Sequence, residues 1–149
     1  MFRSITAEKV VEKSGWAKNR KVDRDKIIQF FEIEGYPIFE NVIEFLENFG
    51  ELIIHFENKK NGIKDDDINF DFYRASHFIA PERINKYYNP RVHKKLVLIG
   101  SAYRDHFVLL MANDNSIYGG YDSFLCKIGD TPIDAVEAII LNKEFSEIE

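Results

Sequence analysis

Histidine and carboxylate side chains are the residues of this chain that could carry acid–base or metal chemistry. The four histidines are His55, His77, His93 and His106, and none forms a short metal-ligand pair with another His or Cys. His106 follows Asp105, so a small hydrolase that uses this pair is one hypothesis. The sequence contains no recognisable nucleophile and base to complete such a site. We therefore expect solvated or hydrogen-bonded histidines, no catalytic residue, no metal and no cofactor.

Cys126 is the single cysteine, so the chain cannot form an internal disulfide. This usage is typical of a reducing compartment. Cys126 lies between Leu125 and Lys127 in a predicted strand, where a cysteine acts as a small buried hydrophobe. A nucleophilic cysteine needs a neighbouring histidine or a helix N-terminus, and neither is evident. The chain begins without a signal peptide and has no run of about 18–20 apolar residues, so we expect a cytoplasmic protein without a membrane segment.

Three successive aspartates, Asp65, Asp66 and Asp67, fall in a stretch from 58 to 67 that we predict to be a polar loop. The stretch lacks the alternating ligands, central glycine and terminal glutamate of an EF-hand calcium loop. A solvated acidic loop and a contact site for a basic partner are the two remaining interpretations. Gly119 and Gly120 do not form a phosphate-binding loop, because they lie in a predicted strand, where glycine marks a bulge or a close backbone approach.

Composition indicates a globular protein of one domain, residues 1–149, with 45% hydrophobic and 30% charged residues. The net charge of -5 argues against a general nucleic-acid binder. It permits attraction to a basic protein, or simply aids solubility. Positions 23–51 hold eight acids and two bases, whereas the only charges from Arg83 to Arg104 are six bases. This uneven distribution predicts a bipolar molecule.

Hydrophobic spacing predicts three helices in the first third of the chain. Thr6 can cap a helix to about Lys13, which Gly15 ends, and Asp23 can cap a second helix that Gly35 stops. A third helix is expected from about 39 to 49, with Gly50 at its C-terminal cap. Its apolar residues recur at 3- and 4-residue spacing and are Phe39, Val42, Ile43, Leu46 and Phe49.

The rest of the chain reads mainly as strands. We predict strands at 52–56, 68–72, 96–99, 107–112, 116–121 and 124–128, with a turn at 113–115. A short helix should begin at Pro81 and end near Tyr88, before Pro90, and the last helix should be capped by Asp130 or Thr131. The fold class is α+β, a single domain with a central, mostly antiparallel sheet of about five or six strands, flanked by N-terminal and C-terminal helices.

Three segments in order resemble a known family. They are Gly15-Trp16 followed by Arg20 and Val22, the run from Phe45 to Leu52, and Leu98-Ile99-Gly100 followed by an apolar strand, a turn and Ile117-Tyr118. This order resembles the SUKH superfamily, most closely its third subfamily, over roughly residues 10 to 141. The resemblance implies an α+β fold and the function of an immunity protein, which binds a cognate bacterial toxin, often a nuclease. It carries over no catalytic residue, because the motif is mainly structural.

The leading functional hypothesis is therefore stoichiometric inhibition of a toxin domain, with no enzymatic activity, no direct nucleic-acid contact and no small-molecule substrate. Acidic regions would steer a basic partner, and a few tyrosine or phenylalanine anchors would supply affinity. An intracellular scaffold or regulatory binding domain on the same fold is the alternative. The candidate partner contacts are Asp65, Asp66, Asp67, Asp114, Tyr118 and Asp122.

Overall fold

The computed structural model describes all 149 residues and has the α+β architecture predicted from the sequence. The chain opens with helices α1 (Ile5–Lys13), α2 (Arg24–Glu34) and α3 (Glu40–Phe49), followed by strands β1 (Ile53–Asn58) and β2 (Ile63–Asn69). A helical connection follows, made of α4 (Phe72–Ala75), α5 (Pro81–Arg83), the π-helical turn η1 (Ile84–Tyr88) and α6 (Asn89–Val92). The chain then forms β3 (Val97–Ala102), β4 (Phe107–Met111), β5 (Ile117–Tyr121), β6 (Phe124–Gly129) and α7 (Pro132–Ile140).

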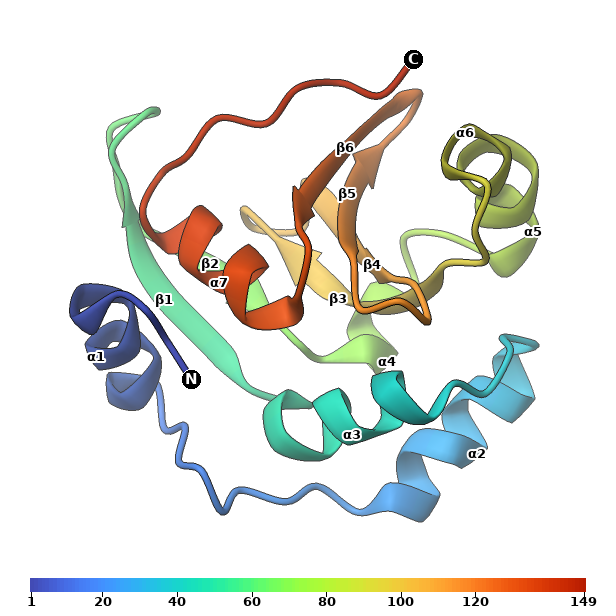
Figure 1. Cartoon of the computed structure of the whole chain (residues 1–149), viewed down its shortest axis with the longest axis horizontal. Helices are drawn as coiled ribbons and strands as arrows, with labels where there is room; N and C mark the ends of the chain where they lie inside the picture. The colour runs from blue at the N-terminus through green and yellow to red at the C-terminus, as the bar shows by residue number, and fades with distance from the viewer.

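The six strands form one antiparallel sheet in which each strand pairs with the next one in sequence. Helix α7 contacts both edge strands, β1 and β6, because the sheet curls around it (Figure 1). Alternate residues of β4 face opposite sides. Leu109 packs with residues of α3 and α7, whereas Val108 faces the side of the connection that carries Ile79 and Tyr88. The middle strands are therefore covered on both faces, as their unbroken apolar runs predict.

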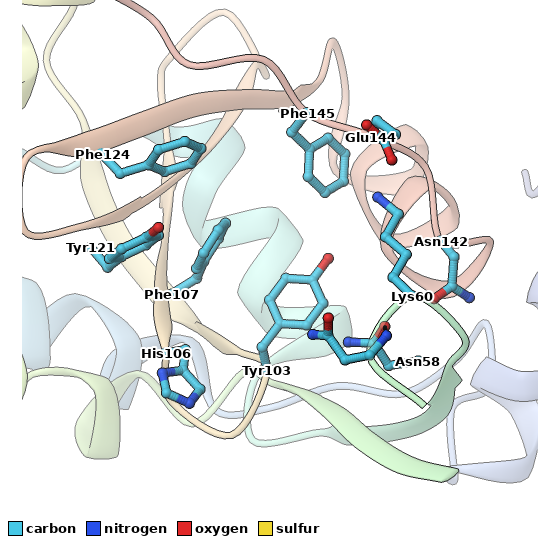
Figure 2. Close-up of a pocket in the computed structure, with 11 residues that line it drawn as sticks. Asn58, Lys60, Tyr103, His106, Phe107, Tyr121, Phe124, Asn142, Glu144 and Phe145 are labelled. Carbon is cyan, nitrogen blue, oxygen red and sulfur yellow. Dashed lines mark hydrogen bonds between the residues drawn. The ribbon is translucent and has the colours of Figure 1, made fainter. Parts of the chain in front are cut away.

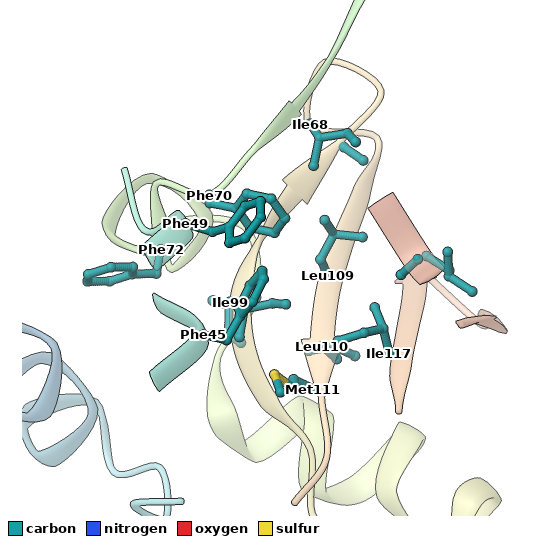
Figure 3. Packing of buried hydrophobic residues seen from close by; sticks show 14 of the residues in the cluster. Phe45, Phe49, Ile68, Phe70, Phe72, Ile99, Leu109, Leu110, Met111 and Ile117 are labelled. Carbon is teal, nitrogen blue, oxygen red and sulfur yellow. The ribbon is translucent and has the colours of Figure 1, made fainter. Parts of the chain in front are cut away.

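Aromatic rings dominate the core between α3 and the sheet (Figure 3). The rings of Phe45 and Phe49 stack with centroids 4.9 Å apart, and Phe45 meets Phe70 edge-on at 5.1 Å. Such offset and edge-to-face pairs stabilise a core beyond the area they bury. The strong apolar stripe of residues 39–49 therefore packs as its spacing predicts.

The predicted helix caps are correct at two of three starts. Asp23 accepts a hydrogen bond from the Asp25 amide, and Thr131 accepts one from the Asp134 amide. The first cap is wrong, because α1 begins at Ile5 and its cap is Ser4, whose hydroxyl oxygen accepts from the Ala7 amide at 3.1 Å. Ser and Thr are both favoured N-caps, so residue type separates candidates two residues apart only weakly.

Two segments differ from the predictions because tertiary pairing outweighs local propensity. Of the predicted loop 58–67, only 59–62 form a turn, since β2 begins at Ile63 and carries all three aspartates beside β1. β2 also ends at Asn69, and the residues from Phe72 form the short helix α4. Pro90 does not terminate its helix, because it occupies the first turn of α6, where no backbone N–H is needed.

The family-like motif residues hold the N-terminal segment against α3. The Trp16 indole donates to Asn48 Oδ1 at 2.8 Å, and Arg20 donates to the Asn48 carbonyl at 3.0 Å. Gly100 is needed in β3, because a Cβ there would lie 2.4 Å from the Asn69 carbonyl oxygen. These residues are structural, as the resemblance implies. No helix in the structure is both long and apolar enough to cross a bilayer.

Candidate protein-binding surface

The three successive aspartates take three different environments along β2. Asp65 is exposed and pairs with His55 Nδ1 at 3.0 Å. Asp66 is buried, and its carboxylate accepts from Asn58 at 2.9 Å and from the Asp67 amide at 2.9 Å. Asp67 accepts from the Arg104 amide at 3.1 Å, and burial raises its pKa. Only Asp65 is therefore fully available on the surface of the free protein.

The other three predicted contacts also fall in separate places. Asp114 is exposed in the turn before β5, where hydrogen bonds from Lys94 and Ser116 hold its pKa well below its usual range. Tyr118 is 3% exposed, and its hydroxyl accepts from Lys94 at 2.8 Å. Asp122 is exposed in the turn after β5, at the other end of that strand. The six residues thus do not form one surface, and a contact made by Tyr118 or Asp66 would require the fold to open.

The residues that could carry chemistry are not assembled into a reactive centre. The Asp105 carboxylate is bonded to Arg74 at 2.6 Å and to the Ser101 hydroxyl at 2.7 Å, and its pKa is lowered mainly by the hydrogen bond from Arg74. The Asp105 carboxylate therefore takes part in this ion pair and does not orient His106. Cys126 is fully buried, and burial raises the pKa of its thiol to about 11. No three His, Cys, Asp or Glu side chains are grouped so that they could hold a metal ion.

The strand ends that carry the β3–β4 and β5–β6 turns hold a chain of aromatic rings. Tyr103 lies 5.2 Å from Phe107, Phe107 lies 5.1 Å from Tyr121, and Tyr121 lies 5.1 Å from Phe124, measured between ring centroids. Tyr121 is 46% exposed, and the others are half-buried. Each ring is thus fixed by its neighbours and still reaches solvent, which is the character of an interface anchor.

A pocket of about 470 Å³ opens against these rings (Figure 2). The Tyr103 hydroxyl points into it, and Phe145 from the C-terminal tail lies across it. Asn58, Lys60, Asn142 and Glu144 add polar groups around its rim. An apolar floor with a polar rim is the usual composition of a binding pocket.

A second hollow of about 430 Å³ lies on the other side of the same strand ends. Its lining includes Phe78 and Arg83 from the helical connection and Asp122 from the β5–β6 turn. His106 and Tyr121 line both hollows, so they stand on the ridge between them. We call the ridge and its rings the strand-end surface, defined as Tyr103, His106, Phe107, Tyr121, Asp122 and Phe124.

Sequence reasoning found part of this surface. It named Asp122 as a contact, and it expected a few tyrosine or phenylalanine anchors. It missed Phe107, Phe124 and Phe145, which read as ordinary apolar residues of strands and tail. A usable signal was present, since aromatic residues flank both turns, at 103 and 107 and at 121 and 124.

The fold and this surface define a small α+β protein with a cluster of partly exposed aromatic rings at one end of its sheet. The model of the SUKH-3 immunity protein family matches residues 4–142, so the chain belongs to that family. Membership indicates a role in toxin immunity, and such families are generally non-enzymatic. No curated protein and no solved structure matches the chain.

Proposed function

We propose that this protein neutralises a cognate bacterial toxin domain by stoichiometric binding through the strand-end surface. The observation that carries the proposal is the ridge of Tyr121 and His106 between two hollows, backed by rings packed about 5 Å apart. Rigid tyrosine side chains supply contact area at little entropic cost. A bound toxin would insert side chains into both hollows and contact the ridge from both sides.

The anchoring of this surface favours recognition by a preformed shape. The Tyr88 hydroxyl donates to the Asp122 carbonyl at 2.9 Å, and Arg91 donates to the Ser123 carbonyl at 2.8 Å. Both bonds fix the β5–β6 turn to the helical connection. Preorganised contacts lose less free energy to ordering when a partner binds.

The distribution of charge supports a basic toxin, such as a nuclease. Asp25, Glu32 and Glu44 are exposed on α2 and α3, and none of them belongs to an ion pair. By contrast, Glu40, Glu47 and Glu51 on the same two helices and just beyond them are paired with Arg24 or Lys26. Unpaired surface carboxylates raise the association rate of a cationic partner and do so most at low salt.

The test is co-expression with the toxin candidate from the neighbouring gene. We expect the protein to restore growth, to co-purify in a fixed stoichiometry and to suppress toxin activity in proportion to its amount. Suppression by a small fraction of an equivalent would indicate turnover and would contradict stoichiometric inhibition. A stable complex with no protection of growth would favour the scaffold alternative.

A further inference from the structure

The last seven residues, 143–149, cross the end of the sheet from the β1–β2 hairpin to β6 (Figure 1). At the start of this crossing, Asn142 bonds the Glu57 carbonyl at 3.0 Å and the Lys59 amide at 2.8 Å. Lys60 donates to the Lys143 carbonyl. The tail therefore leaves a fixed point beside β1 and spans the pocket on its way to the opposite edge of the sheet.

At that opposite edge, the tail pairs with β6 as a short extra strand. The Ile148 amide donates to the Leu125 carbonyl at 2.7 Å, and Glu147 is the bridge partner of Cys126. Arg91 donates to the Ile148 carbonyl and lies 3.8 Å from the Glu147 carboxylate. An edge strand offers unpaired backbone groups to any extended segment, and here the chain's own tail takes them.

Between these two ends, Phe145 reaches into the pocket of the strand-end surface (Figure 2). Its ring is half-buried, with Lys60 Nζ 5.5 Å from the ring centroid. The pocket still encloses about 470 Å³ with Phe145 in place, so a larger aromatic side chain would find room there. The Tyr103 hydroxyl, which points into this space, could bond a polar tip on such a side chain.

The tail is held weakly compared with the elements around it. Glu144, Ser146, Glu147 and Glu149 are exposed, and only Phe145 and Ile148 are partly buried. Segments with few buried apolar contacts open locally at low free energy. The family match also ends at residue 142, so the tail lies outside the matched part of the chain.

We propose that the β6 edge and the adjoining pocket form a docking site for an extended segment of the partner protein, which displaces residues 143–149. The segment pairs with β6 and places an aromatic side chain where Phe145 now lies, with an acidic residue two positions later near Arg91. The tail shows this chemistry directly, because Phe145 and Glu147 have that spacing. The inference depends on the proposed function in one respect, because it takes the toxin to be the partner that supplies the segment.

The test titrates a synthetic peptide of residues 143–149 into full-length protein and follows the Leu125 and Cys126 amides by NMR. One protein is the wild type, and the other carries Phe145→Ala and Ile148→Ala, which loosen its own tail. A tethered tail competes at an effective concentration in the millimolar range. We therefore expect the peptide to bind the loosened variant at least about tenfold more tightly than the wild type, with shifts at β6. A peptide with alanine in place of Phe145 should bind more weakly.

A third protein, with Glu147→Cys, locks the tail. Bridge partners on antiparallel strands lie within the span of a disulfide, so oxidised glutathione can join the new thiol to Cys126. Both thiols are oxidised, and the glutathione disulfide is reduced. The locked form should not bind the peptide, and reduction should restore binding to at least the wild-type level, because Glu147→Cys also removes the contact with Arg91.

Equal peptide affinity for folded wild-type and loosened protein, or no binding to either, would overturn the docking site. The toxin then separates the two proposals. Toxin binding that strengthens when the tail is loosened supports the site as its docking place, and unchanged toxin affinity overturns that assignment. A toxin that binds none of the proteins defeats the proposed function, whatever the peptide does.

Discussion

The hydroxyl of Tyr88, on the π-helical turn, donates a 2.9 Å hydrogen bond to the main-chain carbonyl of Asp122, in the turn between β5 and β6. Tyr88 is 2% exposed, and burial raises the pKa of its phenol. The bond ties the helical connection to the strand-end surface. The bond is partly buried, so its loss should lower stability.

Tyr88→Phe should lower the free energy of unfolding by about 1 kcal/mol, because a single part-buried hydrogen bond is lost with little change in side-chain shape. Urea denaturation measures this difference. Tyr87→Phe is the matched control, since Tyr87 is the neighbouring residue and is 48% exposed. Equal effects of the two substitutions would show that the Asp122 bond contributes nothing.

Gly120→Ala should destabilise the protein by about 1–3 kcal/mol, the usual cost of overpacking. A Cβ at this position would lie 2.8 Å from Tyr88 Cζ, and the ring is enclosed by the core. Thermal or urea unfolding gives the value. Adding Tyr88→Leu to Gly120→Ala should make the alanine less costly than it is in the wild-type background, whereas additive effects would mean that the ring is not the obstacle.

Asp66→Ala and Asp65→Ala should differ sharply although the residues are adjacent. Removal of the buried Asp66 carboxylate leaves the Asn58 amide without its partner and should cost about 1–3 kcal/mol. Asp65 is exposed, and its contact with His55 is a surface pair, so its loss should leave stability unchanged. Denaturation curves of the two variants at pH 7 test the assignment, which fails if Asp65→Ala is the more damaging change.

The substitution Asp105→Asn should make the free energy of unfolding depend less on pH at acidic pH. The hydrogen bond from Arg74 lowers the Asp105 pKa below its unfolded value of about 3.9, so the carboxylate stabilises the fold above that pH. The contribution is lost as the pH falls through the lower, folded pKa. We expect the variant to be about 1 kcal/mol less stable at pH 6, because the exposed Arg74 is partly screened, and the gap to narrow as the pH falls below about 4. A constant gap across this range would contradict the assignment.

Tyr121→Ala should weaken toxin binding by at least about 30-fold, the loss typical of an interface anchor worth 2 kcal/mol. Binding is measured by calorimetry with a toxin that has been inactivated. Tyr73→Ala serves as the control, because Tyr73 is 57% exposed and lines neither hollow. If both variants bind as tightly as the wild type, the toxin does not use the strand-end surface.

Much of the fold could be predicted because apolar spacing is a local property. We could recognise the apolar stripe from Phe39 to Phe49 and the apolar runs of β3 and β4 from the sequence alone, without knowing which elements pack against them. The strand that carries the aspartates of β2 could not be recognised in this way, since it exists only through pairing with β1. Likewise, Ser4 and Thr6 are both favoured N-cap residues, and the sequence alone separates them only weakly.

The candidate surface was less predictable, because it is assembled from distant segments. Tyr103, Tyr121 and Phe145 come from two turns and the tail, and only the curl of the sheet brings them together. Tyr118 was predicted to be a surface contact, but it is buried. A tyrosine beside a turn reads as exposed, yet this one points inward and accepts a bond from Lys94.

The order of the strands in the sheet has a consequence for biosynthesis. Neighbours in the sheet are neighbours in the chain, and four of the five pairings are joined by short turns. Such local contacts form quickly, so β1 to β6 can pair progressively as the polypeptide leaves the ribosome. Asn142, Glu144 and Phe145 follow all six strands in the chain, and they supply one wall of the pocket. The pocket can therefore be completed only after the whole sheet has been synthesised.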